Sequence, residues 1–359
     1  MRVALAMSGG VDSSVAALLL KEQGHEVIGL TMLTCSGGAP PPAGAECVAP
    51  LAVTDARAVA RQLAIEHHVV DLSDLFRAHV VTPFLDDYRA GRTPNPCVIC
   101  NAQIKFGALW RAAAELGAEA LATGHYARVG RSHDGVWLLR RGVDPSKDQS
   151  YFLFRLSQEQ LSRTLFPCGG LTKQDARRIA RTQALRVHDK AESQEICFVP
   201  ERDHTAFLRQ QMGERLTPGE IHDTSGHRIG THPGVQLFTV GQRRGLRLGG
   251  RGEPLYVLRI NAAANRLVVG SEPELYRESC ELTDVHWIPG PPGQPVRAEV
   301  RPRYRHPGAP AWVRAGPGET AGVDFDTAQR ALAPGQAAVF YDGEIVLGGG
   351  WIRGEIEGQ

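Results

Sequence analysis

The chain has 359 residues, of which 42% are hydrophobic and 22% are charged, and its formal net charge is +1. These values are typical of a globular protein, and a net charge this small excludes binding to nucleic acid through an overall positive field. No apolar run reaches the ~20 residues of a membrane span, and seven cysteines, an odd number, indicate thiols kept reduced in the cytosol. We therefore expect a cytoplasmic protein without a membrane partner.

The first third of the chain alternates predicted strands with predicted helices. The strands are expected at 3–7, 27–33, 68–72 and 120–123, and the helices at 15–20, 55–64, 76–88 and 103–116. This alternation predicts an α/β fold with a doubly wound parallel sheet. Ligands of such sheets bind beyond the carboxyl ends of the strands, an edge that would gather the residues following each strand.

In the remaining two thirds of the chain, the alternation of strands and helices gives way to short β-like runs. A further strand is expected at 136–141, and Thr172 with Asp175 resembles a capping box that begins a helix ending near Gln183. From about residue 210, short β-like runs at 235–240, 255–260, 266–270 and 337–341 alternate with Gly and Pro. We read these as a small β-rich central domain followed by a C-terminal β-barrel or sandwich, of which the barrel is our prediction. The predicted domains are residues 1–205, 206–275 and 276–359.

A glycine-rich segment, Ser8-Gly9-Gly10-Val11-Asp12-Ser13, joins the first predicted strand to the first predicted helix. Glycines let backbone N–H groups turn toward an anion, and the helix N-terminus adds positive potential. No Gly-Lys-Ser/Thr follows, so this is not a Walker A loop. The segment resembles the PP-loop of ATP pyrophosphatases, and Asp12 would be the carboxylate for Mg²⁺. The alternative is an ordinary Gly–Ser turn.

Three cysteines lie in settings that suggest chemistry. Cys97 and Cys100 form a Cys-x-x-Cys pair just before a predicted helix, where the helix dipole is expected to lower the pKa of a thiol. Half of a zinc site or a redox pair are alternatives, although a structural zinc site needs four ligands. Cys197 lies in the segment 193–198. The three thiols could instead be ligands of an iron–sulfur cluster.

Two stretches are locally basic, and one histidine lies at a predicted strand end. Residues 239–260 contain five arginines against one carboxylate, and 296–315 contain five more together with Tyr304 and Trp312. Arginines beside aromatic residues suit phosphate contact and base stacking, although scattered surface arginines are an alternative for each stretch. His125 follows the strand at 120–123, and it is either a site residue or a structural histidine.

Eight motifs occur in an order that resembles the bacterial tRNA-specific 2-thiouridylases, which belong to the PP-loop ATP pyrophosphatase superfamily with its adenine nucleotide alpha hydrolase-like fold. They lie at 8–14, 91–96, 100–101, 104–106, 123–126, 147–152, 193–198 and 241–246. The resemblance covers nearly the whole chain. It implies ATP-dependent 2-thiolation of the wobble uridine of tRNA. The C2 oxygen would be adenylated, and sulfur would then come from a cysteine persulfide.

The resemblance also implies partners and site residues. Cys197 would carry a persulfide received from a sulfur-relay protein or a cysteine desulfurase, and Cys100 would release the sulfur by closing a Cys100–Cys197 disulfide. ATP with Mg²⁺ is expected as cofactor, tRNA as substrate, and a monomer as the assembly. The implied ATP-binding residues are Ala6, Met7, Ser8, Gly9, Gly10, Val11, Asp12, Ser13, Met32 and Gly124. The implied residues for tRNA and the target base are Asn95, Pro96, Cys97, His125, Lys147, Asp148, Gln149, Arg303, Tyr304 and Gln336.

Two features depart from the family, and two other functions compete. The loop at 36–47 carries less charge than the resemblance leads us to expect. Some family members have an aspartate, assigned a role near the base, where this chain has Cys97. Another PP-loop enzyme, such as an amidotransferase or argininosuccinate synthetase, would have the ATP site without the cysteines. An RNA-binding module without catalysis would need no PP-loop.

Overall fold

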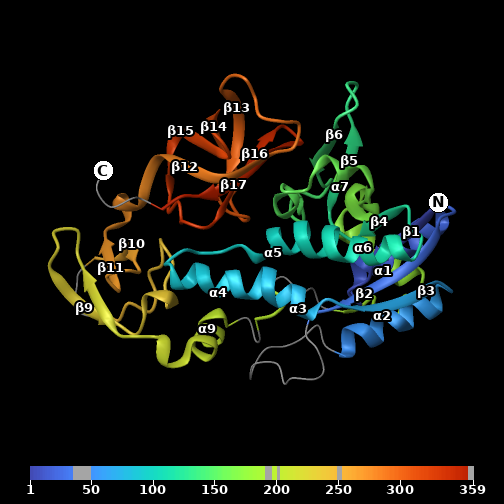
Figure 1. The fold of residues 1–359 in the computed structure, drawn as a ribbon, viewed down its shortest axis with the longest axis horizontal. Helices are drawn as coiled ribbons and strands as arrows, with labels where there is room; N and C mark the ends of the chain where they lie inside the picture. Colours follow the sequence, from blue (N-terminus) through green and yellow to red (C-terminus); the bar gives the residue numbers. More distant parts are fainter. Residues whose placement is uncertain (35–49, 191–195, 200–202, 249–252, 355–359) are drawn as a thin grey trace. The chain divides into compact units, whose positions relative to one another are not determined.

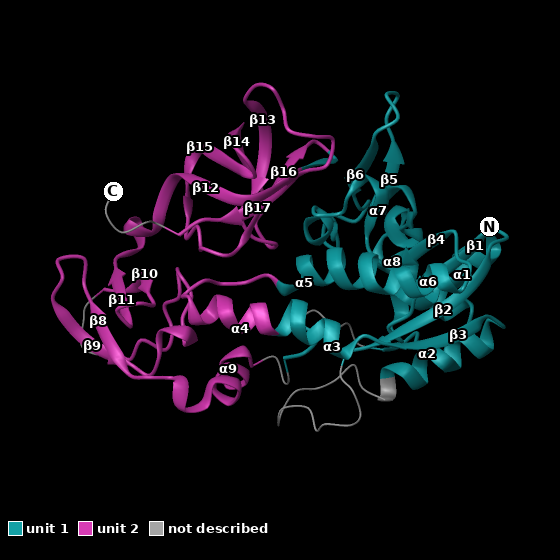
Figure 2. Ribbon diagram, in the orientation of Figure 1, with its two compact units in different colours: residues 1–81, 96–202, 344–347 teal, residues 82–95, 203–343, 348–359 magenta. Residues whose placement is uncertain are grey.

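The computed structural model describes residues 1–34, 50–190, 196–199, 203–248 and 253–354 (Figure 1). The chain forms two compact units (Figure 2). Unit 1 comprises residues 1–81, 96–202 and 344–347, and unit 2 comprises 82–95, 203–343 and 348–359. Among the helices of the described residues, none is both long and apolar enough to cross a membrane.

Unit 1 contains a five-stranded sheet with the order β3-β2-β1-β4-β7. Its neighbouring strands all run parallel, which confirms the predicted parallel α/β fold. The strands are β1 (Arg2–Ala6), β2 (Glu26–Leu33), β3 (Glu66–Asp71), β4 (Ala120–Thr123) and β7 (Thr164–Leu165). β1 is central, and its residues Val3, Ala4 and Leu5 are fully buried, as expected for a strand covered on both faces.

Helices pack around this sheet. They are α1 (Val11–Glu22), α2 (Pro50–Gln62), α3 (Ser73–Phe76), α7 (Gln158–Ser162) and α8 (Lys173–Thr182), with short 3₁₀ turns at Ser150–Leu153 and Pro167–Gly170. The predicted capping box of α8 is confirmed, because Thr172 and Asp175 exchange side-chain to backbone hydrogen bonds of 3.1 and 3.2 Å. α2 begins earlier than predicted, at Pro50 rather than at residue 55.

Two helical stretches change their hydrogen-bond register along their length. The first passes from α3 through a π-helical turn, η1 (Arg77–Val81), into α4 (Thr82–Arg89), which belongs to unit 2. The second runs in unit 1 from α5 (Pro96–Ile99) through η2 (Cys100–Leu109) into α6 (Trp110–Glu115). η2 is π-helical over 10 residues, whereas π-helices mostly occur as single turns. The predicted helix at 103–116 lies in this second stretch.

A hairpin in unit 1 follows β4. Its strands β5 (Ala127–Arg131) and β6 (Trp137–Arg141) pair antiparallel, so the predicted strand at 136–141 is confirmed. Residues 344–347 belong to the same unit, and there Ile345 pairs with Arg140 of β6.

Unit 2 contains a small four-stranded sheet with the order β10-β11-β8-β9. The strands are β8 (Gly219–His222), β9 (Arg228–His232), β10 (Tyr256–Asn261) and β11 (Arg266–Gly270), and α9 (His204–Met212) precedes them. Phe84 of α4 lies 6.2 Å from Phe207 of α9 between ring centroids. The strand predicted at 235–240 is wrong, because Val235–Leu237 forms a 3₁₀ turn.

Six antiparallel strands, which belong to unit 2 except for residues 345–347, form the predicted β-barrel, coloured orange to red in Figure 1. They are β12 (Tyr276–Trp287), β13 (Val296–Arg301), β14 (Ala309–Ala315), β15 (Thr320–Arg330), β16 (Ala337–Asp342) and β17 (Ile345–Ile352). The order is β12-β15-β14-β13-β16-β17, and β17 pairs with β12, which closes the barrel. In β14, Ala311 and Val313 are buried whereas Trp312 is exposed, as the side-chain alternation of a strand requires.

Candidate active site

The loop between β1 and α1 is held in a conformation that glycine permits. Gly9 has a φ of +66°, and a Cβ at this position would lie 2.5 Å from the carbonyl oxygen of Ala52. Two hydroxyls tie the loop to the first turn of α1, because the backbone N–H of Ser8 donates to Ser13 Oγ at 3.3 Å and Ser14 Oγ donates to the carbonyl of Gly10 at 2.8 Å. The loop therefore presents backbone N–H groups at a helix N-terminus, where an anion binds well.

The end of β4 lies directly against this loop. A Cβ on Gly124 would lie 2.8 Å from the backbone carbon of Asp12 and 2.8 Å from the backbone nitrogen of Ser13. A larger residue at 124 would therefore push the loop away. The neighbouring predicted residue Met7 is buried, and its carbonyl accepts a hydrogen bond of 2.8 Å from Thr31 of β2. Met32 is the next residue of β2. The roles of these residues in ATP binding stay predictions.

The carboxylate of Asp12 has two partners. Lys173 Nζ donates to both of its oxygens, at 2.6 and 2.7 Å, and the hydroxyl of Tyr126 donates to Oδ1 at 2.8 Å. Lys173 is 8% exposed, whereas the Asp12 side chain is 34% exposed, so only the lysine side of this ion pair is shielded from water. The sequence interpretation missed Lys173, although its place directly after the N-cap of α8, at a predicted helix start, was a usable signal.

A second lysine, also missed from the sequence, reaches the loop. Lys190 Nζ donates to the carbonyl of Gly9 at 3.0 Å and to Asp55 Oδ2 at 2.7 Å. Lys173 and Lys190 therefore place two positive charges at the glycine-rich loop. Lysine ammonium groups are common ligands of phosphate groups, so this part of unit 1 suits a polyphosphate.

The three candidate cysteines occupy one neighbourhood of unit 1. Cys97 lies in α5, Cys100 begins η2, and Cys197 lies in the segment 196–199. Burial, with the nearby thiols of Cys100 and Cys97, raises the pKa of Cys197 to about 12, so the three sulfurs interact despite their separation in sequence. All three are free thiols. The residues at 193–195 of the Cys197 motif lie outside the described residues.

The predicted lowering of the thiol pKa values is wrong. Burial raises the pKa of Cys97 to about 11, and burial also raises the pKa of Cys100. The loss of water around the thiols is the largest effect on both pKa values, and it outweighs the favourable field expected at the start of a helix. The residue Cys197 keeps an exposed surface, although burial of its thiol is the main cause of its raised pKa.

One cation acts on all of these thiols. The ammonium of Lys105 lowers the pKa of Cys97, Cys100 and Cys197, although burial outweighs this effect at each of them. Among the described residues, no carboxylate forms an ion pair with Lys105. This lysine is therefore available to stabilise an anionic sulfur, and it is a further residue that the sequence interpretation did not single out.

His125 lies near the same lysine. Burial first and the charge of Lys105 second lower the pKa of His125 well below its ordinary value, so its ring is neutral at neutral pH. Its Nδ1 is 2.7 Å from Thr123 Oγ1. Its ring centroid lies 6.3 Å from that of Phe106 and 6.1 Å from that of Phe166. These contacts fix the imidazole in place, and its predicted contact with tRNA stays a prediction.

The three predicted tRNA residues 147–149 differ in what their side chains do. Asp148 is 3% exposed, and its carboxylate accepts hydrogen bonds from the backbone N–H and the hydroxyl of Ser150. The side chain of Gln149 accepts from the backbone N–H of Tyr126 at 3.0 Å. Both side chains therefore hold the local backbone, whereas Lys147 is half-buried.

The remaining predicted tRNA residues lie in unit 2, except for Pro96. Gln336 Nε2 donates to the carbonyl of Thr93 at 2.9 Å, so it anchors the backbone just before Asn95. Arg303 donates to the carbonyl of Arg330 at 3.0 Å, and Tyr304 is half-buried.

Part of the basic stretch at 296–315 is neutralised. Arg297 pairs with Asp326, with one bond of 2.7 Å, and Arg314 pairs with Asp324. The local positive charge is therefore smaller than the sequence suggested.

A metal site is not evident at these residues. Within the part of the chain that the structure describes, no group of three or more His, Cys, Asp or Glu side chains is arranged to hold a metal ion. The carboxylate of Asp12 is already neutralised by Lys173, so it does not fit a Mg²⁺ ligand in this arrangement. Mg²⁺ therefore stays a prediction.

Comparisons with known proteins agree with this arrangement. Family models described as tRNA methyl transferase HUP domain, tRNA methyl transferase PRC-barrel domain and Aminomethyltransferase beta-barrel domain match residues 1–201, 205–271 and 277–352. The tRNA-specific 2-thiouridylase MnmA of Geotalea uraniireducens is 48% identical over 98% of this chain and 95% of that protein. The protein of the same name from Syntrophotalea carbinolica is 49% identical over 98% of both chains.

A solved structure described as a 4-thiouridine synthetase–RNA complex with bound ATP is similar over 58% of this chain and 50% of that one. Its sequence is 20% identical and its TM-score is 0.34, so this likeness is too weak to support an argument.

The parallel sheet with its glycine-rich loop between β1 and α1 defines a PP-loop protein of the α/β class. The closed C-terminal barrel and the matching family models and relatives, which together cover nearly the whole chain, then identify one family within this class. The chain belongs to the family of tRNA-specific 2-thiouridylases.

Proposed function

We propose that this protein uses ATP to replace the C2 oxygen of the tRNA wobble uridine with sulfur. The observation that carries the proposal is the gathering of Cys97, Cys100 and Cys197 around Lys105, in the same unit as the PP-loop. An ATP-binding loop alone would fit many ligases. Free thiols brought together from distant parts of the chain indicate sulfur transfer, because disulfide exchange needs two cysteines that can meet.

The first step activates the base. The C2 oxygen attacks the α-phosphate of ATP, pyrophosphate leaves, and an O-adenylated uridine remains. The backbone N–H groups of the loop at 8–13 and the ammonium groups of Lys173 and Lys190 would hold the phosphates. No step is assigned to Mg²⁺.

The second step transfers sulfur. The terminal sulfur of a Cys197 persulfide attacks C2, and AMP leaves with the former C2 oxygen. The Cys100 thiolate then attacks Cys197 Sγ and breaks the S–S bond, which leaves 2-thiouridine and a Cys100–Cys197 disulfide. An external thiol must reduce this disulfide before the next turnover. A sulfur-relay protein or a cysteine desulfurase would supply the persulfide sulfur, and we propose such a protein as a partner.

The test supplies purified protein with unmodified tRNA, ATP and a cysteine desulfurase with cysteine. Digested tRNA is analysed for 2-thiouridine by mass spectrometry, and the nucleotides are separated. We expect one 2-thiouridine per tRNA, with AMP and pyrophosphate as products. Formation of ADP and phosphate, or a tRNA that remains unthiolated while ATP is consumed, would contradict the proposal.

A further inference from the structure

The helical segment that begins at Cys100 has an unusual register. η2 is π-helical over 10 residues, and π-helices rarely extend beyond one turn. Gly107 supports this register, because a Cβ there would lie 3.3 Å from the carbonyl oxygen of Ala102, five residues earlier. A stretch this long needs support from outside the helix, since the α-helical register is normally preferred.

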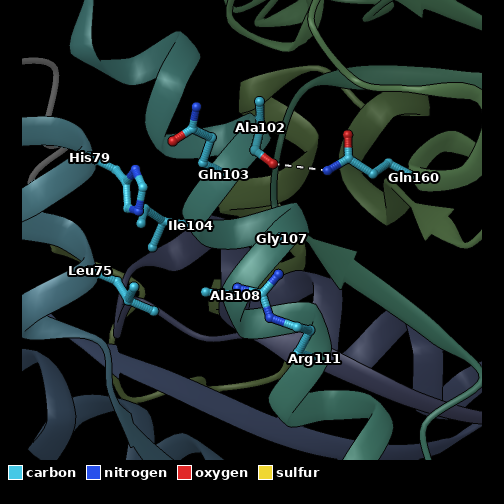
Figure 3. A pocket seen from close by; sticks show the side chains of 9 residues that line it. All are labelled: Leu75, His79, Ala102, Gln103, Ile104, Gly107, Ala108, Arg111 and Gln160. Carbon is cyan, nitrogen blue, oxygen red and sulfur yellow. Dashed lines mark hydrogen bonds between the residues drawn. The ribbon is translucent and has the colours of Figure 1, made fainter.

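One side chain supplies such support. Gln160 Nε2 donates to the carbonyl of Ala102 at 2.9 Å (Figure 3) and to the carbonyl of Phe106 at 3.0 Å. The two carbonyls lie four residues apart, so they follow one another along one side of η2. An amide nitrogen with two hydrogens that binds both carbonyls fixes their spacing along the helix. Gln160 thus acts on the backbone of η2 and not on its side chains.

Packing on this side of η2 is incomplete. A cavity of about 330 Å³ lies beside it, lined by Ala102, Gln103, Gly107 and Ala108 of η2 and by Leu75 and His79 (Figure 3). Where side chains do not fill the space, they do not oppose a change of register. The hydrogen bonds from Gln160 are then contacts that support the register at this face.

The register decides where Cys100 and Lys105 point. In an α-helix, residues five apart are separated by about 140° around the axis. The wider turn of a π-helix brings residue i+5 closer to the face of residue i. This placement agrees with the action of Lys105 on Cys100, Cys97 and Cys197.

We propose that Gln160 is a positioning residue, which sets the direction of the Cys100 thiol and of Lys105 by fixing the π-helical register of residues 100–109. The proposal rests on the proposed function for the role of Cys100. Gln160 touches neither ATP nor tRNA in this account, so its loss should lower the rate of sulfur transfer and leave substrate binding intact.

Gln160 also caps the helix α7, so that substitutions can separate this role from its hydrogen bonds to η2. Its Oε1 accepts from the backbone N–H of Ser157 at 3.0 Å, as part of the capping box of α7. Gln160→Glu keeps an acceptor for the cap of α7 and loses the donor to the carbonyls of η2. Gln160→Lys keeps a donor of similar reach and loses the acceptor.

Two further variants are controls. Ser157→Ala weakens the cap of α7 alone. Gln158→Glu makes the same chemical change in the same helix, where Gln158 donates to the carbonyl of Trp137 at 2.9 Å.

Three quantities are measured for each variant: kcat and KM for tRNA thiolation, the alkylation rate of Cys100 by iodoacetamide, and hydrogen exchange of the peptide 100–109. For Gln160→Glu we expect kcat to fall by about tenfold, because a displacement of about 1 Å can cost up to 10²-fold. The KM values should stay within about twofold, and amide exchange in 100–109 should become faster. Gln160→Lys should recover most of kcat, and Ser157→Ala and Gln158→Glu should remain near the parent.

Two results would overturn the proposal. In the first, Gln160→Glu turns over as fast as Gln158→Glu. In the second, Gln160→Lys is as slow as Gln160→Glu, which would assign the defect to the cap. If the parent protein makes no 2-thiouridine, the proposed function fails, while alkylation and hydrogen exchange still test whether Gln160 fixes the register.

Discussion

Lys173 Nζ lies 2.6 Å from one carboxylate oxygen of Asp12 and 2.7 Å from the other, across 161 positions of sequence. The pair joins the first turn of α8 to the first turn of α1, beside the loop that would bind ATP. The pair is a structural contact, and we predict that its lysine also binds phosphate groups of ATP. In that case the Asp12 carboxylate would lose its cation when ATP binds.

Separate and combined substitutions should distinguish these two roles. Lys173→Met leaves the Asp12 carboxylate without its cation and should lower the free energy of unfolding by about 1–3 kcal/mol. This loss is smaller than for a fully buried ion pair, because Asp12 is partly exposed. Adding Asp12→Asn should restore most of the lost stability, whereas neither the single nor the double variant should release pyrophosphate. Denaturant unfolding and a pyrophosphate assay check these outcomes, and recovery of pyrophosphate release in the double variant would show that neither side chain contacts the phosphates.

The raised thiol pKa values predict slow alkylation at neutral pH. Burial, together with the neighbouring thiols, raises the pKa of Cys197 to about 12, so its sulfur is protonated at neutral pH and should react slowly with alkylating reagents. At pH 7.5 we expect Cys197 to react with iodoacetamide more slowly than a cysteine of the unfolded protein. The rate should rise steadily with pH above 9. Lys105→Met should slow it further, whereas the matched control Arg111→Met should not. If Cys197 reacted faster in the folded protein than in the unfolded protein, its pKa would not be raised.

The same shifts have a consequence for stability. Cys97 and Cys197 have pKa values of about 11 and about 12 in the folded protein, against an ordinary value of 9.0. The folded state therefore keeps protons that the unfolded state releases first. The free energy of unfolding should be unaffected below pH 9 and should fall as the pH rises from about 9 to about 12. The free energy of unfolding is measured by urea unfolding across this pH range, and it should depend less steeply on pH in Cys97→Ser. An unchanged pH dependence in this variant would argue against a buried Cys97 thiol.

The sequence predicted the parts of the site that local patterns determine. The run of small and apolar residues at 3–7, followed by Gly9 and Gly10, was enough for a strand, a tight loop and a helix. The approach of Gly124 to this loop followed from the rule that parallel strands end at one edge. The π-helical register of 100–109 could not be predicted, because it depends on Gln160, which follows much later in the chain and contacts the backbone.

Burial explains the other failures. A Cys-x-x-Cys pair before a predicted helix suggested a low thiol pKa, but the pKa of Cys100 depends on how completely the fold excludes water, which the sequence does not state. The partners of Arg297 and Arg314 are acidic residues of β15, so the charge of the basic stretch could be judged only after the strands were paired. Both cases concern contacts between residues that are distant in sequence.

Binding of tRNA to unit 2 should depend on salt, and the arginines of 296–315 should contribute unequally to it. Arg303→Ala should weaken binding and reduce the slope of log K against log salt by roughly one unit, since each phosphate contact contributes about that much. Arg314 is already paired with Asp324, so Arg314→Ala serves as the matched control and should change the slope less. Filter binding between low and moderate salt checks both. Equal slopes for the parent and Arg303→Ala would remove this arginine from the tRNA contact.

The three cysteines should differ in role, because only one of them would carry the transferred sulfur. Cys197→Ser should abolish both the labelling of the protein by ³⁵S from a desulfurase and the thiolation of tRNA. Cys100→Ser should still accept the label and fail to release it, because Cys100 is the thiol that would break the persulfide bond. Cys97→Ser should be milder than either. Mass spectrometry of the protein and of digested tRNA measures both stages.

An iron–sulfur cluster with these three thiols as ligands makes a different prediction. All three serine variants would then be equally inactive, and protein purified without oxygen would show a visible absorption band from thiolate-bound iron. We expect no such band in the parent protein, and loss of activity only at Cys100 and Cys197. Thiolated tRNA produced by Cys197→Ser at the parental rate would exclude a persulfide on Cys197, whatever the other two variants do. A visible band that disappears in each variant would replace the persulfide mechanism with the cluster.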